Sequence, residues 1–400
     1  MATGLAIVGA LLLIVCGAML VLAAVLLLQT LAAWPPGQTT EPRAAGRPRL
    51  AVLMPAHNEA SVIRQALGSV FPQLNPGDRL LVVADNCSDD TAIVAAAGGA
   101  EVLERHDPQR RGKGYALEFG VRHFELSPPD TVIIVDADCE LSPQCLDHLA
   151  RVCVHTGRPV QALYLMRAAP GAGLTTRIAE FAWAVKNHAR PLGYHRLGMP
   201  CQLMGTGMAF PWNQIRAAPL ASGHIVEDMQ LGLHLAGEGW PPVFCASALV
   251  TSAFPIGAEA LTAQRTRWEH GHLGLIASHA PRLLWRSLMR GEARTAAMVL
   301  DLCVPPLAAL LLMSLAVWSL AAVLLAMGGA VLPLALSTFL LAMLCLAVML
   351  AWWRFGRQIV SLRELLAAPA YALAKLPIYA KLLTKRQAEW VRTKRNDERN

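Results

Sequence analysis

Hydrophobic positions along the chain form two patterns, long uncharged stretches and shorter runs between them. Residues 5–33 and 302–353 carry no charged side chain, and each exceeds the roughly 20 residues that a membrane-spanning helix needs. Glycine and proline interrupt the second stretch, which predicts two helices, near 302–326 and 331–353. A cleaved signal peptide is the alternative for the first stretch. Its apolar core is far longer than about 7–15 residues, so we expect a retained anchor.

The shorter apolar runs alternate with helical patterns, and polar residues follow most of the runs. This alternation predicts an α/β domain with a mostly parallel sheet, which binds its ligand at the carboxyl ends of the strands. The predicted strands are 50–54, 80–84, 100–104, 132–135 and 243–253, and the predicted helices are 61–71, 90–97, 115–125, 229–237 and 258–280. Residues 174–194 mix apolar, basic and Trp side chains, which predicts a helix in the membrane interface.

Composition supports a membrane protein, since hydrophobic residues make up 54% of the chain and charged residues only 16%. The net charge of +7 comes from Arg clusters next to the apolar stretches, which indicates a membrane surface and argues against nucleic acid. These clusters follow the first span, precede the second and follow the third. Basic residues favour the cytoplasmic side. We therefore expect a multi-pass protein of the inner (cell) membrane, with its N-terminus outside and its central domain and C-terminus in the cytoplasm.

Two aspartates, Asp136 and Asp138, directly follow the buried run at 132–135. Residues i and i+2 of a strand point the same way, so the two carboxylates can act together. Such hard oxygen ligands suit a divalent cation that also takes phosphate oxygens. Two solvated turn aspartates are the alternative.

Two further motifs carry polar groups that can serve chemistry. Glu227 and Asp228 precede the helix at 229–237, where capping that helix is the simpler role for Asp228. Gln264, Arg267 and Trp268 fall on one face of the helix at 258–280. A face with Arg and Trp is also typical of a membrane interface.

Taken together, these motifs resemble those of the membrane-bound family-2 glycosyltransferases, the inverting group that includes cellulose, chitin and hyaluronan synthases. Four elements occur in that family's order, and the similarity covers about residues 50–280. They are Asp85 after the second strand, Asp136-x-Asp138, Glu227-Asp228 and Gln264-x-x-Arg267-Trp268. The resemblance implies a GT-A (nucleotide-diphospho-sugar transferase) domain flanked by transmembrane and interfacial helices.

The resemblance also implies a role for each matching residue. Asp138, with Asp136 beside it, would hold Mg²⁺ or Mn²⁺ on the donor diphosphate, and Asp228 would be the general base. Glu227, Gln264, Arg267 and Trp268 would shape the acceptor site and steady the pyrophosphate. The nucleotide would lie among Pro55, Asn58, Glu59, Asp85 and Lys113.

The expected organisation has six parts. They are a transmembrane helix (1–34), a linker (35–49), the cytoplasmic GT-A domain (50–257), interfacial helices (258–297), two transmembrane helices (298–356), and an amphipathic or re-entrant segment (359–384) within a basic C-terminal region (357–400).

We expect transfer of a sugar from a nucleotide-sugar, a UDP-sugar first, to a membrane-associated acceptor. A polysaccharide intermediate is the first predicted acceptor and a lipid the second, and polysaccharide-export proteins are candidate partners. A transporter or scaffold that only binds nucleotide is the alternative class. Charged residues within the spans would favour it, and Asp301, at the edge of a span, is the single candidate in the sequence.

Overall fold

The structure is a computed structural model that describes residues 2–34, 46–255 and 258–379. At its centre is an eight-stranded sheet in the order β3-β2-β1-β4-β7-β6-β8-β5. The strands are β1 (Leu50–Ala56), β2 (Arg79–Asp85), β3 (Glu101–Arg105), β4 (Thr131–Ile134), β5 (Glu140–Leu141), β6 (Val160–Arg167), β7 (Met208–Pro211) and β8 (Val243–Ala253).

Half of the sheet is parallel, as the alternating pattern predicts. β1 pairs in parallel with β2 on one side and with β4 on the other, and β2 pairs in parallel with β3. β7 then runs antiparallel to both β4 and β6, and β6 pairs in parallel with β8. The carboxyl ends of β1, β2 and β4 therefore meet at one edge of the sheet.

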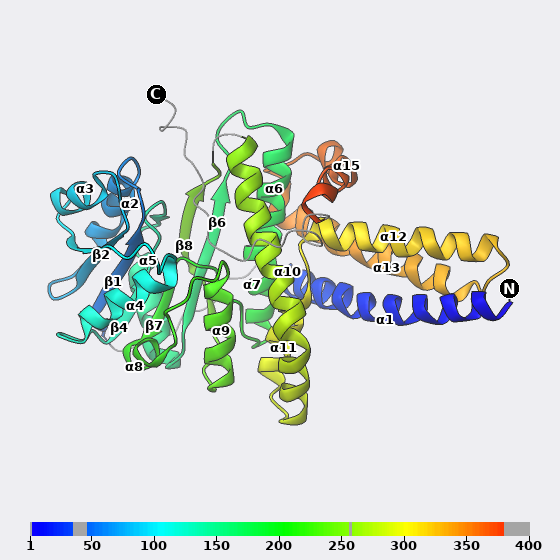
Figure 1. Cartoon of the computed structure of the whole chain (residues 1–400), viewed down its shortest axis with the longest axis horizontal. Coiled ribbons are helices and arrows are strands. Elements are labelled where there is room, and N and C mark those ends of the chain that lie inside the picture. Colours follow the sequence, from blue (N-terminus) through cyan, green and yellow to red (C-terminus); the bar gives the residue numbers. More distant parts are fainter. Residues whose placement is uncertain (1, 35–45, 256–257, 380–400) are drawn as a thin grey trace.

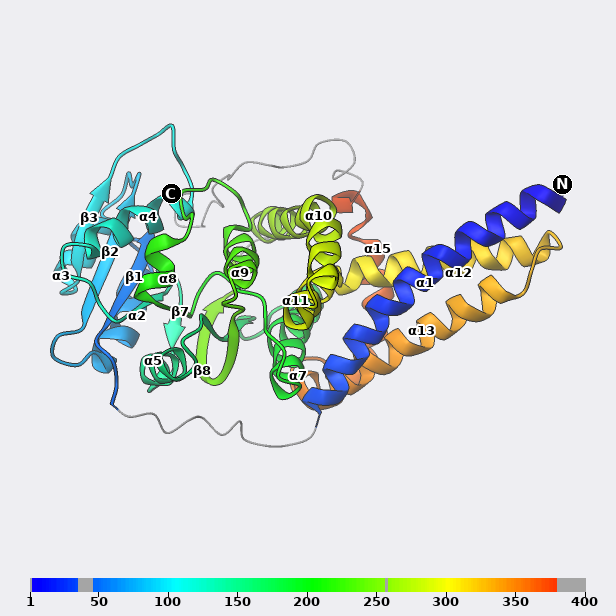
Figure 2. The same cartoon turned by 90° about the horizontal axis from the view of Figure 1, so that it is seen from below.

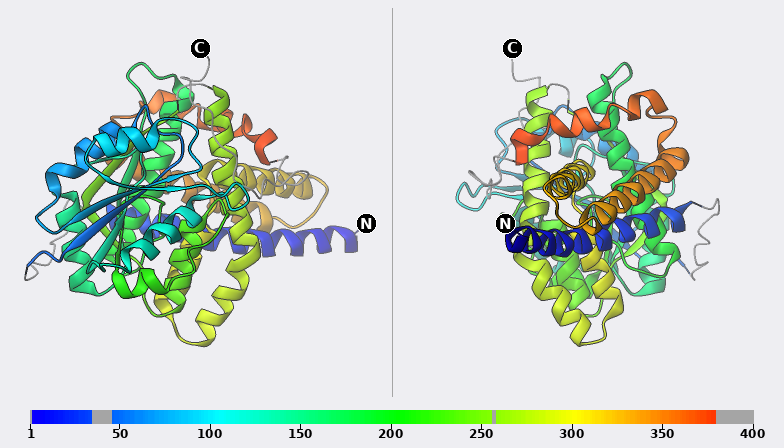
Figure 3. Two further views of the ribbon diagram at one scale, coloured as in Figure 1. Left: turned by 60° about the vertical axis from the view of Figure 1, so that its left-hand side comes forward. Right: turned by 90° about the vertical axis from the view of Figure 1, so that its right-hand side faces the viewer.

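Helices cover both faces of this sheet (Figures 1 and 3). Along β1, Leu50 and Val52 pack on one face and Ala51 and Leu53 on the other. Because both faces are buried, the strand is continuously apolar instead of alternating. The first face is covered by α2 (Ile63–Val70), η1 (Phe71–Gln73), α3 (Thr91–Ala97) and α5 (Cys145–Thr156), and the second by α4 (Lys113–Phe124), α8 (Trp212–Ala217) and α9 (Glu227–Gly237).

One long helix lies between the sheet and the apolar helices. It runs through α6 (Leu174–Ala184), a π-helical turn η2 (Val185–Ala189) and α7 (Arg190–Arg196). Phe181 packs in the core of the apolar helices, and Ala179 packs in the core of the sheet. The helix predicted at 174–194 is thus present, but much of it is buried between two layers of the protein.

Three helices in the described part of the chain are long and apolar enough to cross a membrane. They are α1 (Ala2–Ala33), α12 (Leu307–Ala326) and α13 (Leu332–Ala351). They contact one another and extend together away from the sheet (Figures 1 and 2). The start of α1 and the turn between α12 and α13 lie at the same far end of this bundle (Figure 2).

The helix predicted near 302–326 begins later than expected, at Leu307. Residues up to Cys303 form the end of α11 (Ala293–Cys303), which follows α10 (Ala258–Met289). Pro305 and Pro306 separate α11 from α12, because proline has no N–H to donate and disfavours helix in the residue before it. Hydropathy alone does not distinguish the end of α11 from the span.

Asp301, the charged residue at the edge of a span, is held by internal partners. Nη2 of Arg190 donates to Oδ1 of Asp301 at 2.8 Å, and Nε2 of Gln29 donates to the same oxygen at 2.6 Å. All three side chains are buried. They join α1, α7 and α11, so Asp301 has a structural role and does not support the transporter alternative.

The described part of the segment at 359–384, predicted as a surface-lying amphipathic helix or a re-entrant segment, is divided into short helices. After a π-helical turn η3 (Trp352–Gly356) come α14 (Leu362–Leu365) and α15 (Ala368–Leu373). Both are far shorter than a membrane span. α14 contacts α6, and α15 contacts α6 and α12 (Figure 1). Residues 380–384 lie outside the described part of the chain.

Candidate active site

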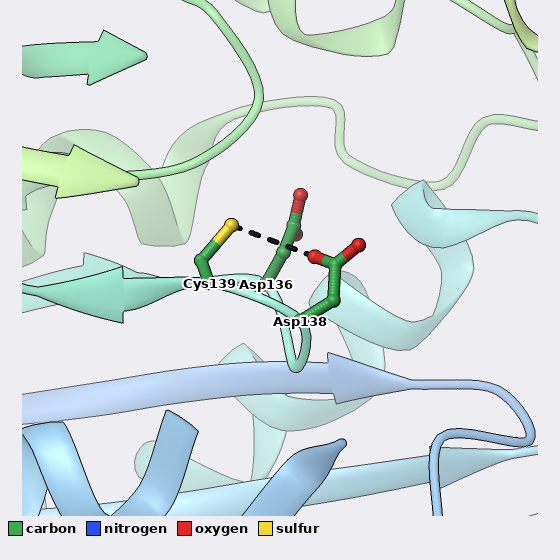
Figure 4. A group of neighbouring side chains, drawn as sticks. All are labelled: Asp136, Asp138 and Cys139. Atoms are coloured by element: carbon green, nitrogen blue, oxygen red, sulfur yellow. Dashed lines mark hydrogen bonds between the residues drawn. The ribbon is translucent and has the colours of Figure 1, made fainter. Parts of the chain in front are cut away.

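Two aspartates follow β4 at the carboxyl edge of the sheet. Asp136, Asp138 and Cys139 each offer one ligand atom, and these atoms lie within 4.8 Å of one another. Figure 4 shows the three side chains on one short turn. The Cys139 thiol donates weakly to Oδ1 of Asp138, with 3.5 Å between sulfur and oxygen. Burial raises the pKa of Cys139 well above its usual value, so the sulfur is a neutral thiol rather than a thiolate ligand.

The two carboxylates fit a hard divalent cation. Asp138 is exposed and Asp136 is half-buried, so both are accessible from the edge of the sheet. Mg²⁺ and Mn²⁺ prefer carboxylate, water and phosphate oxygens, and Mg²⁺ in particular needs only one or two protein carboxylates when a substrate diphosphate supplies further ligands. These residues can therefore hold the predicted metal.

Lys113, at the start of α4, joins Asp136 to a glycine turn. Its Nζ forms an ion pair with Asp136 and donates to the carbonyl oxygen of Gly205 at 2.8 Å. A Cβ built on Gly205 would lie 3.5 Å from Oδ2 of Asp228 and 3.8 Å from Nζ of Lys113. Burial disfavours the charged lysine, but the neighbouring carboxylates outweigh burial and raise its pKa. Lys113 is therefore a charged group between the aspartate pair and Asp228.

Glu227 and Asp228 are the first two residues of α9. The N-cap is Val226, and Oδ1 of Asp228 accepts from the backbone N of Met229 at 2.8 Å. The cap interpretation of Asp228 is therefore wrong, because a cap lies before the first turn and reaches an N–H two or three residues ahead.

Both carboxyl groups bind protons more tightly than usual. Burial raises the pKa of Asp228. Burial and the charge of Asp228 raise the pKa of Glu227 to about 8. A carboxylate with a raised pKa is better matched to accepting a proton near neutral pH.

Asp85, at the end of β2, is neutralised by an arginine of the next strand. Nη1 of Arg105 donates to Oδ1 of Asp85 at 2.6 Å, and Nδ2 of Asn86 donates to the same oxygen at 3.0 Å. The backbone oxygen of Asp85 is bonded by Nδ1 of His57 at 2.6 Å. These contacts join the ends of β1, β2 and β3.

Asn58 and Glu59, two of the predicted nucleotide-site residues, follow the end of β1 and lie beside the loop after β2. Oδ1 of Asn58 accepts from the backbone N of Ser88 at 2.7 Å, and its Nδ2 donates to the Ser88 hydroxyl at 3.0 Å. The backbone N of Glu59 donates to Thr91 at 2.8 Å. Pro55 is inside β1, in register with Val83.

Gln264, Arg267 and Trp268 lie on α10, where it approaches α6. The Trp268 ring centre is 4.9 Å from that of Trp183 in α6. Burial lowers the pKa of the Arg267 guanidinium. Oε1 of Gln264 is buried and has no hydrogen-bond partner within the residues that the structure describes. This face of α10 is therefore turned into the protein.

A cavity of about 580 Å³ connects part of this site to the bundle of apolar helices. At one end it is lined by charged residues: Lys113, Asp136, Glu227, Asp228 and Arg267. At the other end it is lined by apolar residues of α12 and α13, including Leu311, Leu344 and Val348. Trp268 lies on its wall, and α14 and α15 cover one side. The cavity leads from the edge of the sheet to the apolar helices α12 and α13.

Comparison with known families decides the identity of this domain. Residues 48–271, more than half of the 400-residue chain, match the family described as "Glycosyltransferase like family 2". The chain belongs to this family. The expectation of a family-2 glycosyltransferase domain is therefore confirmed, and the narrower resemblance to cellulose, chitin and hyaluronan synthases stays a prediction.

Two relatives match the family-2 domain at 28% identity. One, over 253 residues, is a probable glucomannan 4-beta-mannosyltransferase 10 of Arabidopsis thaliana, and the match covers 57% of this chain and 44% of that protein. The other, over 246 residues, is the probable glycosyltransferase YdaM of Bacillus subtilis (strain 168), with 56% and 55% covered. The chain spans about half the length of these relatives.

A solved structure shares the fold across nearly the whole chain. It is the mannosyltransferase PcManGT from Pyrobaculum calidifontis in complex with GDP-Man and Mn²⁺. The TM-score is 0.53 at 16% identity, and the match covers 95% of this chain and 99% of that one. The predicted GT-A fold with long apolar helices is thereby confirmed.

The structure brings some predicted residues of the glycosyltransferase domain together at the cavity and leaves others outside it. Pro55, Asn58, Glu59 and Asp85 lie along the neighbouring ends of β1 and β2 instead, and Asp138 and Gln264 are also absent from the lining of the cavity.

Sequence reasoning assigned no site role to three further cavity residues, which are Lys186, Asn187 and Arg265. Trp183 and Lys186 are three residues apart on a predicted helix, a spacing that places both on one face. That spacing could have indicated Lys186, whereas the π-helical turn that contains it left no signal in the sequence.

Proposed function

We propose that the chain is an inverting glycosyltransferase that moves a sugar from a nucleotide-diphospho-sugar to a lipid acceptor delivered from the membrane. The observation that carries this proposal is the cavity that joins Asp228 and Asp136 to apolar side chains of α12 and α13. A soluble sugar acceptor would gain little binding free energy from an apolar cavity wall of this kind. An acyl or polyprenyl chain can lie in it, with its head group among the charged residues.

The donor would lie at the carboxyl edge of β1, β2 and β4. Asp136 and Asp138 would hold Mg²⁺ or Mn²⁺, which neutralises charge that develops on the departing diphosphate. The PcManGT structure, determined with GDP-Man and Mn²⁺, supports this assignment by its shared fold. Lys113 would supply a second positive charge after release from Asp136.

The transfer would be a single displacement. The acceptor hydroxyl oxygen forms a bond to the anomeric carbon, and its proton passes to the Asp228 carboxylate. The bond from that carbon to the diphosphate oxygen breaks, and the electron pair leaves with the nucleoside diphosphate. Arg267 would stabilise this negative charge, and Trp268 would pack against the apolar face of the sugar ring.

A growing polysaccharide is the other acceptor that the sequence suggests. The described residues favour the lipid, because the wall of the cavity near the bundle is formed by leucine and valine side chains of α12 and α13. A hydrated glycan would gain little from burying such surface.

The arrangement of the bundle supports the predicted topology. The N-terminus and the α12–α13 turn share the end of the bundle that is far from the sheet (Figure 2). Both the GT-A domain and the interfacial helices would then face the cytoplasm, where nucleotide-sugars are the donors.

A donor screen tests the proposal. The purified protein in lipid nanodiscs is given a panel of UDP- and GDP-sugars with Mg²⁺ or Mn²⁺, and release of free nucleotide is measured. We expect release with at least one donor and its loss in excess EDTA. Nucleotide release that continues unchanged in EDTA would refute the metal-dependent mechanism, and no release with any donor would refute the assigned donor class.

A further inference from the structure

The half-buried Lys186 has no direct counter-charge among the residues that the structure describes. It lines the cavity, and its Nζ lies 5.2 Å from the centre of the Trp183 ring. Within the described residues Lys186 forms no hydrogen bond and no ion pair, and its ammonium group lies over the face of the Trp183 ring. Lys186 is half-buried, and burial of an ammonium, even in part, favours a partner of opposite charge.

Two of the three carboxylates around Lys186 are already engaged in other ion pairs. Asp228, Asp301 and Glu269 act on its pKa, which burial lowers. Asp301 is paired with Arg190, and Glu269 is paired with Lys375. Asp228 remains, and it is the proposed base, which neutralises on accepting a proton.

The backbone at Lys186 is unusual. Residues Val185–Ala189 form a π-helical turn inside an otherwise α-helical segment. Such turns carry an energetic cost and occur frequently at functional sites. Within this turn, Oδ1 of Asn187 is buried without a hydrogen-bond partner among the described residues, and Asn187 also lines the cavity. The turn therefore presents a cation and a hydrogen-bond acceptor to the same space.

A second cation, with a buried hydrogen-bond donor that has no partner among the described residues, lies on α10. Arg265 lines the cavity one helical turn before Trp268, which packs against Trp183. Its Nη2 is buried without a hydrogen-bond partner in the part of the chain that is described, and its guanidinium lies 5.8 Å from the Tyr371 ring centre. Buried polar groups normally have partners, so these groups point to a ligand with complementary atoms.

We propose that the acceptor is an anionic lipid with a free hydroxyl, whose phosphate is held by Lys186 and Arg265 while the hydroxyl faces Asp228. This inference rests on the proposed lipid acceptor and narrows its class. A free hydroxyl on the acceptor would give its proton to Asp228, and a phosphate would pair with the two cations. The apolar chain of the lipid would lie at the leucine-lined end of the cavity. A phosphate monoester alone would not need a base, because its oxygen is already ionised.

Two sources share this chemistry. A glycerophospholipid such as phosphatidylglycerol has a phosphodiester and head-group hydroxyls. A polyprenyl diphospho-sugar has a diphosphate and sugar hydroxyls. Both place negative charge between an apolar chain and the nucleophile, which is the order of groups along the cavity.

The test uses the full chain in phosphatidylcholine nanodiscs, with matched probes that differ in charge. One pair is phosphatidylglycerol against diacylglycerol. The other is phytanyl diphospho-N-acetylglucosamine against phytanyl N-acetylglucosaminide. For each probe, labelled sugar in the organic phase is divided by nucleotide released, using the donor found in the screen. The variants are Lys186→Met, Lys186→Arg and Arg265→Met, with Arg122→Met as the control, an exposed arginine on α4.

We expect the wild type to use the anionic member of one pair at least about 10-fold better, in line with a charge-assisted hydrogen bond. Lys186→Met should lose most of this preference through a higher KM for the lipid, Lys186→Arg should keep part of it, and Arg122→Met should keep all of it. Nucleotide release without acceptor should stay unchanged in the Arg122→Met control. The pair that shows the preference identifies the source.

Equal use of charged and neutral lipids by the wild type would overturn the inference and leave the proposed function standing. So would a Lys186→Met variant that loses nucleotide release, since Lys186 would then serve the donor. If Lys186→Met does not fold, the inference is still tested by the preference of the wild type for the anionic lipid and by the loss of that preference in Arg265→Met. Absence of nucleotide release with every donor would instead refute the proposed function itself.

Discussion

Replacing Asp228 by Asn separates its proposed chemical role from its structural contacts. Asn keeps the shape of the side chain and its oxygen, so the 2.8 Å hydrogen bond from the Met229 backbone N can persist. The amide, however, has no affinity for a proton at neutral pH. The substitution removes the base and leaves the geometry of α9 in place.

The two expected effects differ strongly in size. Loss of a general base typically costs about 10²–10⁴-fold in rate, or about 2.7–5.4 kcal/mol of transition-state stabilisation. An acidic group in the first turn of a helix contributes about 0.3–1 kcal/mol to stability. Burial of Asp228 already disfavours its charged form, which offsets part of that contribution. We therefore expect Tm to change by less than about 4 °C.

The assay compares transfer rate, nucleotide-sugar affinity and Tm for wild type and Asp228→Asn. Glu238→Gln, an exposed carboxylate at the end of the same helix, is the matched control. A rate that falls at least about 100-fold with normal donor binding supports the base. A near wild-type rate in a folded Asp228→Asn protein would refute it.

Four further predictions follow from contacts at the site and in the bundle. Asp138→Ala should abolish metal-dependent donor binding, measured by calorimetry with Mn²⁺, while the protein stays in the membrane. Glu227, whose pKa is raised to about 8, is already neutral below that pH, so Glu227→Gln should leave the acid limb of the kcat/KM profile, which reports ionisation of Asp228, in place. Val348→Trp should fill the apolar end of the cavity and slow transfer to lipid without changing donor affinity, whereas Leu346→Trp, exposed on the same helix, should not slow transfer. Arg190→Met leaves buried Asp301 without its cation and should cost about 3–5 kcal/mol of stability, measured by denaturant titration.

Each of these outcomes has a clear opposite. Unchanged Mn²⁺ affinity in Asp138→Ala would remove that aspartate from the metal site. A shifted acid limb in Glu227→Gln would show that Glu227 is charged in that pH range. Equal effects of the two tryptophans would place the acceptor elsewhere, and a fully stable Arg190→Met protein would show that the ion pair is dispensable.

The parallel half of the sheet and the three apolar helices could be predicted because their signals are local. β1, β2 and β4 are continuous apolar runs, and each of α1, α12 and α13 lies within an uncharged stretch. The limits of α12 could not be predicted, because hydropathy does not distinguish the end of α11 from a membrane span. The two short helices after Gly356 also escaped prediction, since their fold depends on contacts with α6 and α12.

The site was predicted where spacing carries chemistry and missed where it depends on packing. Asp136-x-Asp138 is informative because strand geometry alone aligns the two carboxylates. The position of Asp228 after the N-cap, by contrast, could be read only from the backbone of α9. Lys186 faces the cavity from a π-helical turn, and no sequence rule used here predicts such a turn.

The central claim, transfer of sugar to a lipid delivered through the cavity, is tested most directly by the fate of a labelled donor sugar. The protein in nanodiscs is incubated with the donor identified by nucleotide release, and the products are divided between an organic and an aqueous phase. We predict that the label enters the organic phase as a lipid-linked sugar, and that Val348→Trp lowers this amount without lowering donor affinity. Label recovered as a water-soluble polymer, with the organic phase empty, would contradict the account.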